Sequence, residues 1–278
     1  MDSEVQYGSA PNIVIAYPSL QDWLALYKPS TSRGVQWNQA MFADFQRRHE
    51  RTVTEQLDMI RKRATGRAVV AELKARPDHV VKIRPFDFLP KEKWKVGLGA
   101  LTTSLDGPAP TWAAGVPRCG ATFTGKPFCS GHSAPKGTGT GSSAEIYFTA
   151  SRHRAPDETL LHELIHASRM VDGVWYPMPV NGGYGNQEEF LAVLVENIYR
   201  SEKGEKRLSD YKGHPIDTAK FLDATSPSPR AVIAGMRGKQ PSLFSALAAL
   251  PRGMPAFNPV RQVDTEYKTL MQKIEAIM

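Results

Sequence analysis

Apolar residues recur at helical spacing along much of the chain. Over residues 38–64 they follow one another at intervals of three or four positions, or multiples of these, which predicts a long amphipathic helix. Gly66 interrupts the pattern, and residues 68–73 resume it. Two further helices are predicted at about 156–172, beginning with a proline and two acidic residues, and at about 186–202.

Short strands are predicted between these helices. Residues 80–83 and 144–150 are runs of β-branched and aromatic residues, which are typical of strands. The intervening residues 86–143 are rich in Gly, Pro, Ser and Thr, which indicates loops and short strands. Residues 1–35 hold scattered Pro, Gly and Ser around one apolar cluster, so a loosely structured lead-in with one short helix is expected. The mixture predicts an α+β fold with a small β-sheet.

The C-terminal part of the chain is set apart by its many prolines. Short helices are expected between them, at 217–223, 230–236, 242–249 and 264–277. The expected domains are therefore a lead-in (1–35), a central domain (36–205) and a mostly helical C-terminal extension packed on it (206–278).

Composition narrows the class of protein. The formal net charge of +7 over 278 residues could favour an acidic partner, but Lys and Arg are dispersed and no nucleic-acid motif is present, so a solvated basic surface is the preferred interpretation. No apolar run approaches the ~20 residues that cross a bilayer, so no membrane insertion is expected. The N-terminus lacks a secretory signal, so export would need another route.

Two cysteines, Cys119 and Cys129, flank a segment with Gly-Lys-Pro at its centre. Such a segment is typical of a turn, so the two thiols are expected to face each other across a hairpin. A disulfide there would indicate an oxidising compartment, and two free thiols would indicate a cytosolic protein. Both alternatives stay open.

The chemistry is concentrated in one motif on the helix at 156–172. His162 and His166 are four residues apart and therefore project from one helical face, where one metal ion can bind both. Glu163 lies beside the first histidine and can take a proton from metal-activated water, then pass it to the departing amine. Because apolar residues occupy the opposite face, the pattern predicts a catalytic zinc site.

A catalytic zinc ion needs a third protein ligand. No histidine follows at the spacing of the extended three-histidine motif. The next predicted helix begins with Glu188 and Glu189, and either carboxylate would complete a site of two histidines and one glutamate.

Residues 189–192, Glu-Phe-Leu-Ala, resemble the zinc-ligand helix of the gluzincins, and of anthrax lethal factor in particular. Over residues 38–202 the pattern is similar to the bacterial effector metallopeptidases of type III and type VI secretion systems, including VgrG-linked toxin domains. The resemblance implies a zincin-like peptidase with Glu189 as the zinc ligand and Glu188 as its exposed neighbour. It also implies that a tyrosine upstream of the ligand supports the oxyanion, which would be Tyr184, with Tyr176 in reserve.

One position departs from the gluzincin pattern. Gluzincins often carry an acidic residue four positions after the ligand glutamate, where it orients a zinc histidine. Val193 occupies that position, so Glu196 or a backbone carbonyl is expected to take this role. Of the remaining histidines, His153 could line the cleft, but a surface position is preferred.

Substrate is expected to pair with an edge strand beside the active-site helix. The strand at 145–149 would be that edge, and the glycine-rich segment 137–141 could form a flap. The function expected from these features is that of a zinc metallopeptidase acting on a protein or peptide. A delivered bacterial effector or toxin is favoured, with an immunity protein and a secretion-system spike or chaperone as further partners. The alternatives are a housekeeping zinc amidase acting on cell-wall peptides and a non-catalytic zinc-binding module.

Overall fold

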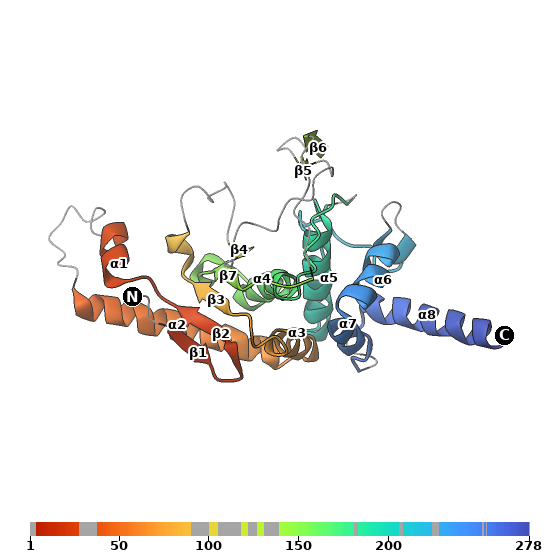
Figure 1. Ribbon diagram of the computed structural model, residues 1–278, viewed down its shortest axis with the longest axis horizontal. Helices are drawn as coiled ribbons and strands as arrows, with labels where there is room; N and C mark the ends of the chain where they lie inside the picture. The colour runs from red at the N-terminus through yellow and green to blue at the C-terminus, as the bar shows by residue number, and fades with distance from the viewer. Residues whose placement is uncertain are drawn as a thin grey trace.

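A computed structural model describes residues 4–27, 38–89, 100–104, 118–121, 127–130, 139–180, 183–205, 208–223, 228–251, 253 and 255–277. In this part of the chain, five strands form a mixed sheet in the order β1-β2-β3-β7-β4 (Figure 1). The strands are β1 Glu4–Tyr7, β2 Ala10–Ala16, β3 Val81–Arg84, β7 Ala144–Tyr147 and β4 Leu101–Ser104. β2, β3 and β7 run parallel, and the outer strands β1 and β4 are antiparallel to their neighbours.

The N-terminal strands are the main difference from the sequence analysis, which predicts no strand there. β2 pairs in parallel with β3, with Ile13 opposite Val81, so this segment belongs to the central sheet. Almost every residue of β2 is buried, so the strand lacks the polar–apolar alternation that marks a half-buried strand. The β-branched run Ile13-Val14-Ile15 was the available signal.

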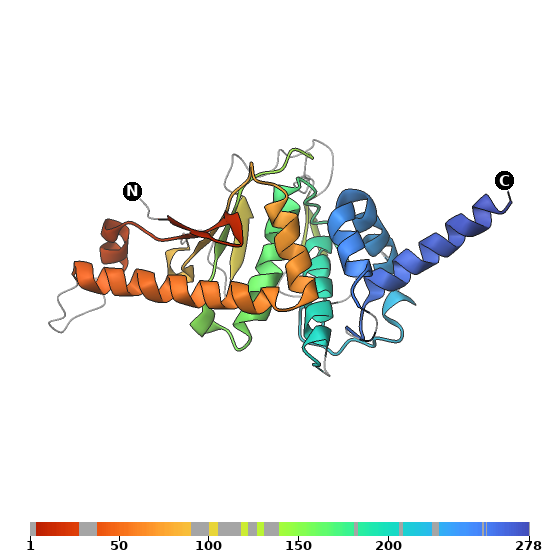
Figure 2. The same cartoon turned by 90° about the horizontal axis from the view of Figure 1, so that it is seen from below.

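Helices cover one face of this sheet (Figures 1 and 2). α3 packs on β2, α4 packs on β7 and β4, α2 contacts both α3 and α4, and α5 packs against α4. The bounds are α1 Leu20–Tyr27, α2 Gln39–Arg61, α3 Ala64–Lys74, α4 Pro156–Val171 and α5 Gln187–Glu202. Gly66 lets α3 approach the end of α2, because a Cβ there would lie 2.0 Å from the carbonyl oxygen of Ile60.

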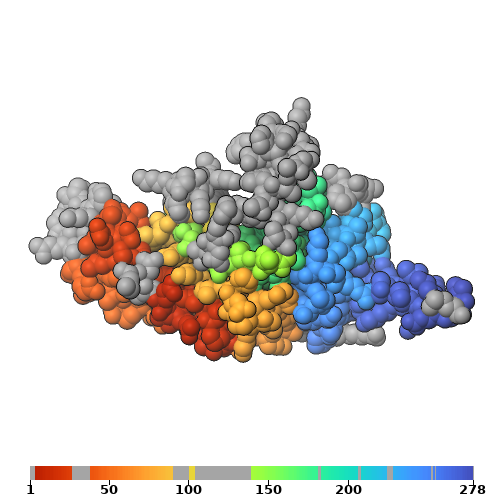
Figure 3. All heavy atoms as spheres, viewed as in Figure 1, coloured from red at the N-terminus to blue at the C-terminus, as the bar shows by residue number. Residues whose placement is uncertain are grey.

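Beyond α5 the chain forms the expected C-terminal helices, which lie at the opposite end of the molecule from α1 (Figure 3). They are α6 Pro229–Lys239, α7 Pro241–Ala248 and α8 Pro259–Glu275, preceded by the short helix η5 Phe221–Asp223. Buried apolar side chains from Tyr7 to Val263 form one continuous core. The α+β class with a helical C-terminal part is confirmed, whereas the division at residues 35 and 205 stays a prediction.

The hairpin predicted around the cysteines is present in the backbone. β5 Arg118–Ala121 pairs antiparallel with β6 Pro127–Ser130, and Cys119 lies directly opposite Cys129. The turn between them lies outside the described residues, and the state of the thiols stays a prediction. Among the helices that the structure describes, none is long and apolar enough to cross a membrane.

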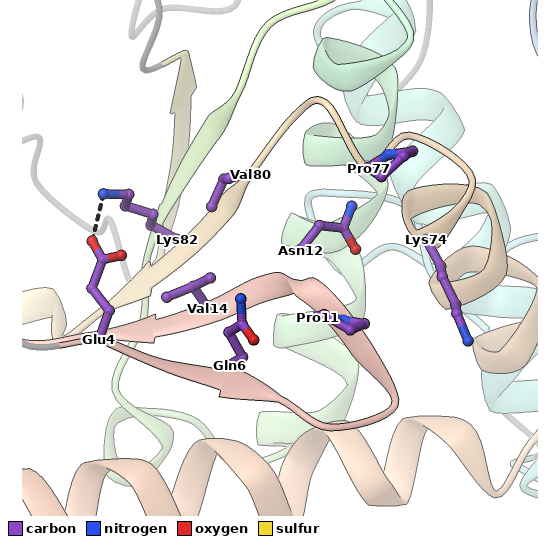
Figure 4. A pocket seen from close by; sticks show the side chains of 9 residues that line it. All are labelled: Glu4, Gln6, Pro11, Asn12, Val14, Lys74, Pro77, Val80 and Lys82. Atoms are coloured by element: carbon purple, nitrogen blue, oxygen red, sulfur yellow. Dashed lines mark hydrogen bonds and ion pairs between the residues drawn. The ribbon is translucent and has the colours of Figure 1, made fainter.

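A hollow of about 870 Å³ lies beside β1, β2 and β3 (Figure 4). Among the described residues that line it, Glu4 is the one with an acidic side chain, and its carboxylate is ion-paired with the Lys82 ammonium. The side-chain amide nitrogen of Asn12 is also engaged, since it donates to three backbone carbonyls around the end of α3. The described lining of this hollow therefore offers neither a set of metal ligands nor a candidate acid–base pair.

Candidate metal centre

α4 presents its two histidines on the face that points away from the core. Pro156 and two acidic residues start the helix, as the positive end of the helix dipole favours, and Gly173 follows its end with a φ of 66°. Leu161 and Leu164 are fully buried against the core. The predicted apolar stripe is therefore confirmed, and it fixes the direction in which His162 and His166 project.

α5 brings a carboxylate to the same place. The side-chain oxygen of Asn186 accepts hydrogen bonds from the backbone N–H groups of Glu188 and Glu189, which caps the N-terminus of the helix. The cap sets the first turn of α5, and Glu189 then faces the two histidines of α4.

The three predicted ligands converge in the structure. One ligand atom from each of His162, His166 and Glu189 can be chosen so that all lie within 4.8 Å of one another. The His162 Nε2 lies 3.1 Å from the Glu189 Oε2 and 3.1 Å from the His166 Nε2, and the His166 Nε2 lies 3.5 Å from the Glu189 oxygen. Two imidazole nitrogens and one carboxylate oxygen are the donor set of a gluzincin-type zinc site, so the residues fit a metal ion.

The electrostatics of this cluster favour positive charge. Burial lowers the pKa of His162, but hydrogen bonds to Glu189 and Glu196 and the charges of Glu196 and Glu163 raise it to about 10. Burial would raise the pKa of Glu189, but its bonds to His162 and His166 lower it below the usual range. Three carboxylates thus face two imidazoles, and a divalent cation would offset two of their three negative charges.

Glu196 orients the first histidine. Its Oε2 lies 3.2 Å from the His162 Nδ1, which leaves the Nε2 directed at the cluster. Of the two groups that the sequence analysis names for this role, the structure places Glu196 there, two turns along α5 from Glu189. The Nδ1 of His166 is buried with no hydrogen-bond partner among the described residues.

Glu163 lies beside these ligands, and a residue of the sheet holds its side chain in place. The hydroxyl of Thr102 on β4 donates to the Glu163 Oε2 at 2.5 Å and lies 3.1 Å from the Glu163 backbone oxygen. Glu163 is only 7% exposed. Thr102 is a residue that the sequence analysis does not identify, because nothing local connects it with the histidine motif.

The cavity around these groups has a volume of about 580 Å³. The loops after α4 and α5 contribute Trp175, which contacts the His166 ring edge-on at 5.5 Å, and Tyr211, whose ring lies 6.1 Å from that of His162. His153 lines the cavity and stacks on Phe148 at 5.3 Å, so the prediction of a surface position is wrong. The stacking on a core phenylalanine explains this placement.

The structure does not bring the predicted oxyanion residue to this cavity. Tyr184 is absent from the described lining and packs edge-on against Phe190 at 5.0 Å, and burial raises its pKa to about 12. Tyr176 donates its backbone N–H to Glu188, and its ring faces the Lys239 ammonium at 4.6 Å. The role assigned to Tyr184 stays a prediction.

Glu188 has a structural place and is not the exposed neighbour that the resemblance implies. It is fully buried, and its carboxylate binds the guanidinium of Arg169, which is 2% exposed, through both oxygens. Arg169 also donates to Gln240 at 2.9 Å and to the backbone of Val174 at 2.9 Å. This buried network joins α4, α5 and the α6–α7 junction behind the metal ligands.

In the part of the sheet that the structure describes, the outer strand beside the site is β4, so the prediction of an edge at 145–149 is wrong. β7 is paired on both sides, by β3 and by β4. Residues 139–141 are the described part of the predicted flap, whose movement stays a prediction. The Gly139 N–H donates to the Gly173 oxygen at 2.9 Å, and a Cβ on Gly141 would lie 2.0 Å from the Val171 oxygen, so this segment is packed against the end of α4.

Comparisons with known proteins agree with this geometry. Residues 38–215, which include both histidines, Glu163, Glu189 and Glu196, match the M91 peptidase family, whose description is "Effector protein". No curated protein and no solved structure matches the chain. The chain therefore belongs to the M91 peptidase family of effector proteins, and its His-His-Glu cluster makes it a metallopeptidase of the zincin type.

Proposed function

We propose that the metal is a single zinc ion held by His162, His166 and Glu189, and that Glu163 is the general base and then the general acid of peptide-bond hydrolysis. The observation that carries the proposal is the convergence of these three ligands, from two helices, on a cavity that also contains Glu163. A zinc ion held by these residues would supply Lewis acidity and would lower the pKa of a bound water toward ~7.

Glu163 is well placed for proton transfer. Thr102 donates to one of its oxygens and so limits the rotation of the carboxylate. A carboxylate held in this way takes a proton from the attacking water and delivers it to the nitrogen of the departing amine. The surrounding side chains exclude bulk water, since Glu163 and His166 are only 7% and 5% exposed.

The substrate is proposed to bind as an extended strand along β4. β4 is the outer strand of the described sheet, and Ala100, Leu101 and Thr102 line the cavity. An extended peptide that lies along this segment reaches the cavity that Glu163 and the three ligands line. Specificity would then come from side chains that line the cavity, Trp175 and His153 among them.

Glu196→Gln is expected to weaken zinc binding by about 10–100-fold, as loss of a carboxylate partner of a zinc histidine does elsewhere. The amide no longer favours the His162 tautomer that directs the Nε2 at the metal. Competition with a chromophoric chelator measures the affinity. Glu55→Gln serves as control, because Glu55 is 60% exposed on α2. Equal zinc affinity in Glu196→Gln and the wild type would contradict this role.

The proposed function is tested with purified chain and a library of quenched-fluorescence peptides, with cleavage products identified by mass spectrometry. Hydrolysis of peptide bonds by the zinc-loaded chain, lost in Glu163→Gln while zinc is retained, is the expected result. Zinc retained with no hydrolysis of any peptide or folded protein would favour a non-catalytic zinc-binding module.

We further propose that the protein is delivered into a target cell, as its membership of an effector family suggests. A secretion-system spike or chaperone would carry it, and a producing bacterium whose kin are targets would need an immunity protein. Expression of the wild type and of Glu163→Gln in bacterial cytoplasm and periplasm tests the target compartment. Toxicity of the wild type alone, in one compartment, is expected, and equal toxicity of both chains would contradict a peptidase toxin.

A further inference from the structure

Tyr211 lines the cavity of the metal ligands but has no role in the reaction as proposed above. It lines the same cavity as His162, Glu163 and Glu189, and its ring is tilted by 30° to that of His162 at 6.1 Å. Burial, together with the charges of Glu189 and Glu163, raises the pKa of its hydroxyl, so the phenol keeps its hydrogen. The residue is 55% exposed, so a substrate in the cavity can reach it.

The turn that carries Tyr211 is fastened to the ligand helix. Asn197 of α5 donates through its amide nitrogen to the Ser209 oxygen at 2.8 Å and accepts from the Ser209 N–H at 3.3 Å. Asn197 is 1% exposed, so this pair of hydrogen bonds is shielded from water. Ser209 also forms a β-bridge with Pro215, which closes the turn.

Asp210 stabilises the turn from within. Its carboxylate accepts from the backbone N–H groups of Lys212 and His214 at 2.9 and 2.8 Å. Burial would raise the pKa of Asp210, but these bonds and the His214 side chain lower it. Gly183 fits closely beside this carboxylate, because a Cβ on it would lie 1.6 Å from the Asp210 Oδ2. The turn is therefore built to hold the residue next to Asp210 in one place.

Tyr184 lies beside this turn and outside the described lining of the cavity. Its ring packs on Phe190, and the charge of Asp210 contributes to its raised pKa, so the residue lies beside the turn and away from the described cavity lining. The two tyrosines therefore differ in the one property that catalysis needs, which is access to the substrate carbonyl.

We propose that Tyr211 is a catalytic residue whose phenol hydroxyl donates a hydrogen bond to the carbonyl oxygen of the scissile peptide as that oxygen gains negative charge. The inference rests on the proposed peptidase function and concerns one step of it. No proton is transferred, because the phenol keeps its hydrogen and stabilises the tetrahedral oxyanion through the bond alone. Asn197 and Asp210 act as positioning residues for this tyrosine.

The test compares Tyr211→Phe with the control Tyr267→Phe, using the best-cleaved peptide of the library. Tyr267 lies on α8, is 42% exposed and is not among the described residues that line the cavity. Tyr211→Phe is expected to lower kcat by about 10²–10³-fold, the usual effect of losing one oxyanion donor, with KM and zinc content unchanged. Tyr267→Phe is expected to keep wild-type kcat, and Tyr184→Phe tests the rival assignment. A phosphonate analogue of the same peptide, which imitates the tetrahedral oxyanion, should lose affinity for Tyr211→Phe by a similar factor.

The outcomes separate this inference from the proposed function. Wild-type kcat and phosphonate affinity in Tyr211→Phe, with Glu163→Gln inactive, would overturn the role of Tyr211 alone. A large loss in Tyr184→Phe but not in Tyr211→Phe would assign the oxyanion to Tyr184. Wild-type activity in Glu163→Gln would instead overturn the proposed function. Circular dichroism melting checks that the phenylalanine variants are folded.

Discussion

Glu163→Gln is expected to reduce kcat by about 10²–10⁴-fold, the range that a positioned general acid–base group contributes. The amide keeps the size of the side chain and can still accept the hydrogen bond from Thr102. It cannot take a proton from water, so both halves of the reaction lose their proton carrier. Steady-state cleavage of the library peptide measures the loss.

Zinc content separates a chemical defect from a structural one. Glu163 is not among the three clustered ligands, so Glu163→Gln should bind zinc as the wild type does. A variant that keeps zinc, folds normally and retains more than about a tenth of wild-type kcat would contradict the assignment.

Arg169→Met is expected to destabilise the protein by about 3–5 kcal/mol, because it leaves the Glu188 carboxylate buried without its partner. Glu188 is fully buried, and Arg169 also satisfies Gln240 and the backbone of Val174. Urea unfolding followed by circular dichroism measures the change in the free energy of unfolding. Since Glu188 precedes Glu189 on α5, zinc binding should weaken as well.

Two further variants make this prediction sharp. Arg48→Ala removes an exposed ion pair with Asp44 on α2 and should change stability by no more than about 1 kcal/mol. The double variant Arg169→Met/Glu188→Leu removes both buried charges and should recover part of the loss. A loss below about 1 kcal/mol in Arg169→Met would show that this network is not needed to hold α4 against α5.

The local parts of the site could be predicted from the sequence. His162 and His166 owe their shared face to helical spacing alone, and the apolar residues between them fix the side that faces the core. Glu189 comes from the start of the next helix, where the resemblance distinguishes it from Glu188. Glu196 follows Glu189 by two helical turns, so its place beside His162 is again a matter of helical spacing.

The parts that depend on tertiary contacts could not be predicted in this way. Thr102 reaches Glu163 from a short strand within a Gly- and Pro-rich region, where four residues give too weak a pattern for a strand. Tyr211 is brought over His162 by a turn that Asn197 holds from α5. His153 was misplaced because its stacking partner, Phe148, belongs to the core.

β2 and β7 are buried on both faces, and for this reason their places in the sheet were predicted incorrectly. β2 has no alternating pattern, so the polar and apolar positions of residues 1–35 predict a lead-in without strands. For the same reason the fully buried β7 was placed at the edge, although strands buried on both faces belong inside a sheet. Glu188 shows a related error, since a glutamate is almost never fully buried unless paired, and Arg169 is its partner.

The most direct test of the account is a titration of the metal-free chain with zinc while cleavage of the library peptide is followed. Activity is predicted to be absent at the start and to rise in proportion to added zinc until one ion is bound per chain, where it should level off. Peptide cleavage by the metal-free chain, or no cleavage at any zinc ratio by a chain that has bound its ion, would contradict the account.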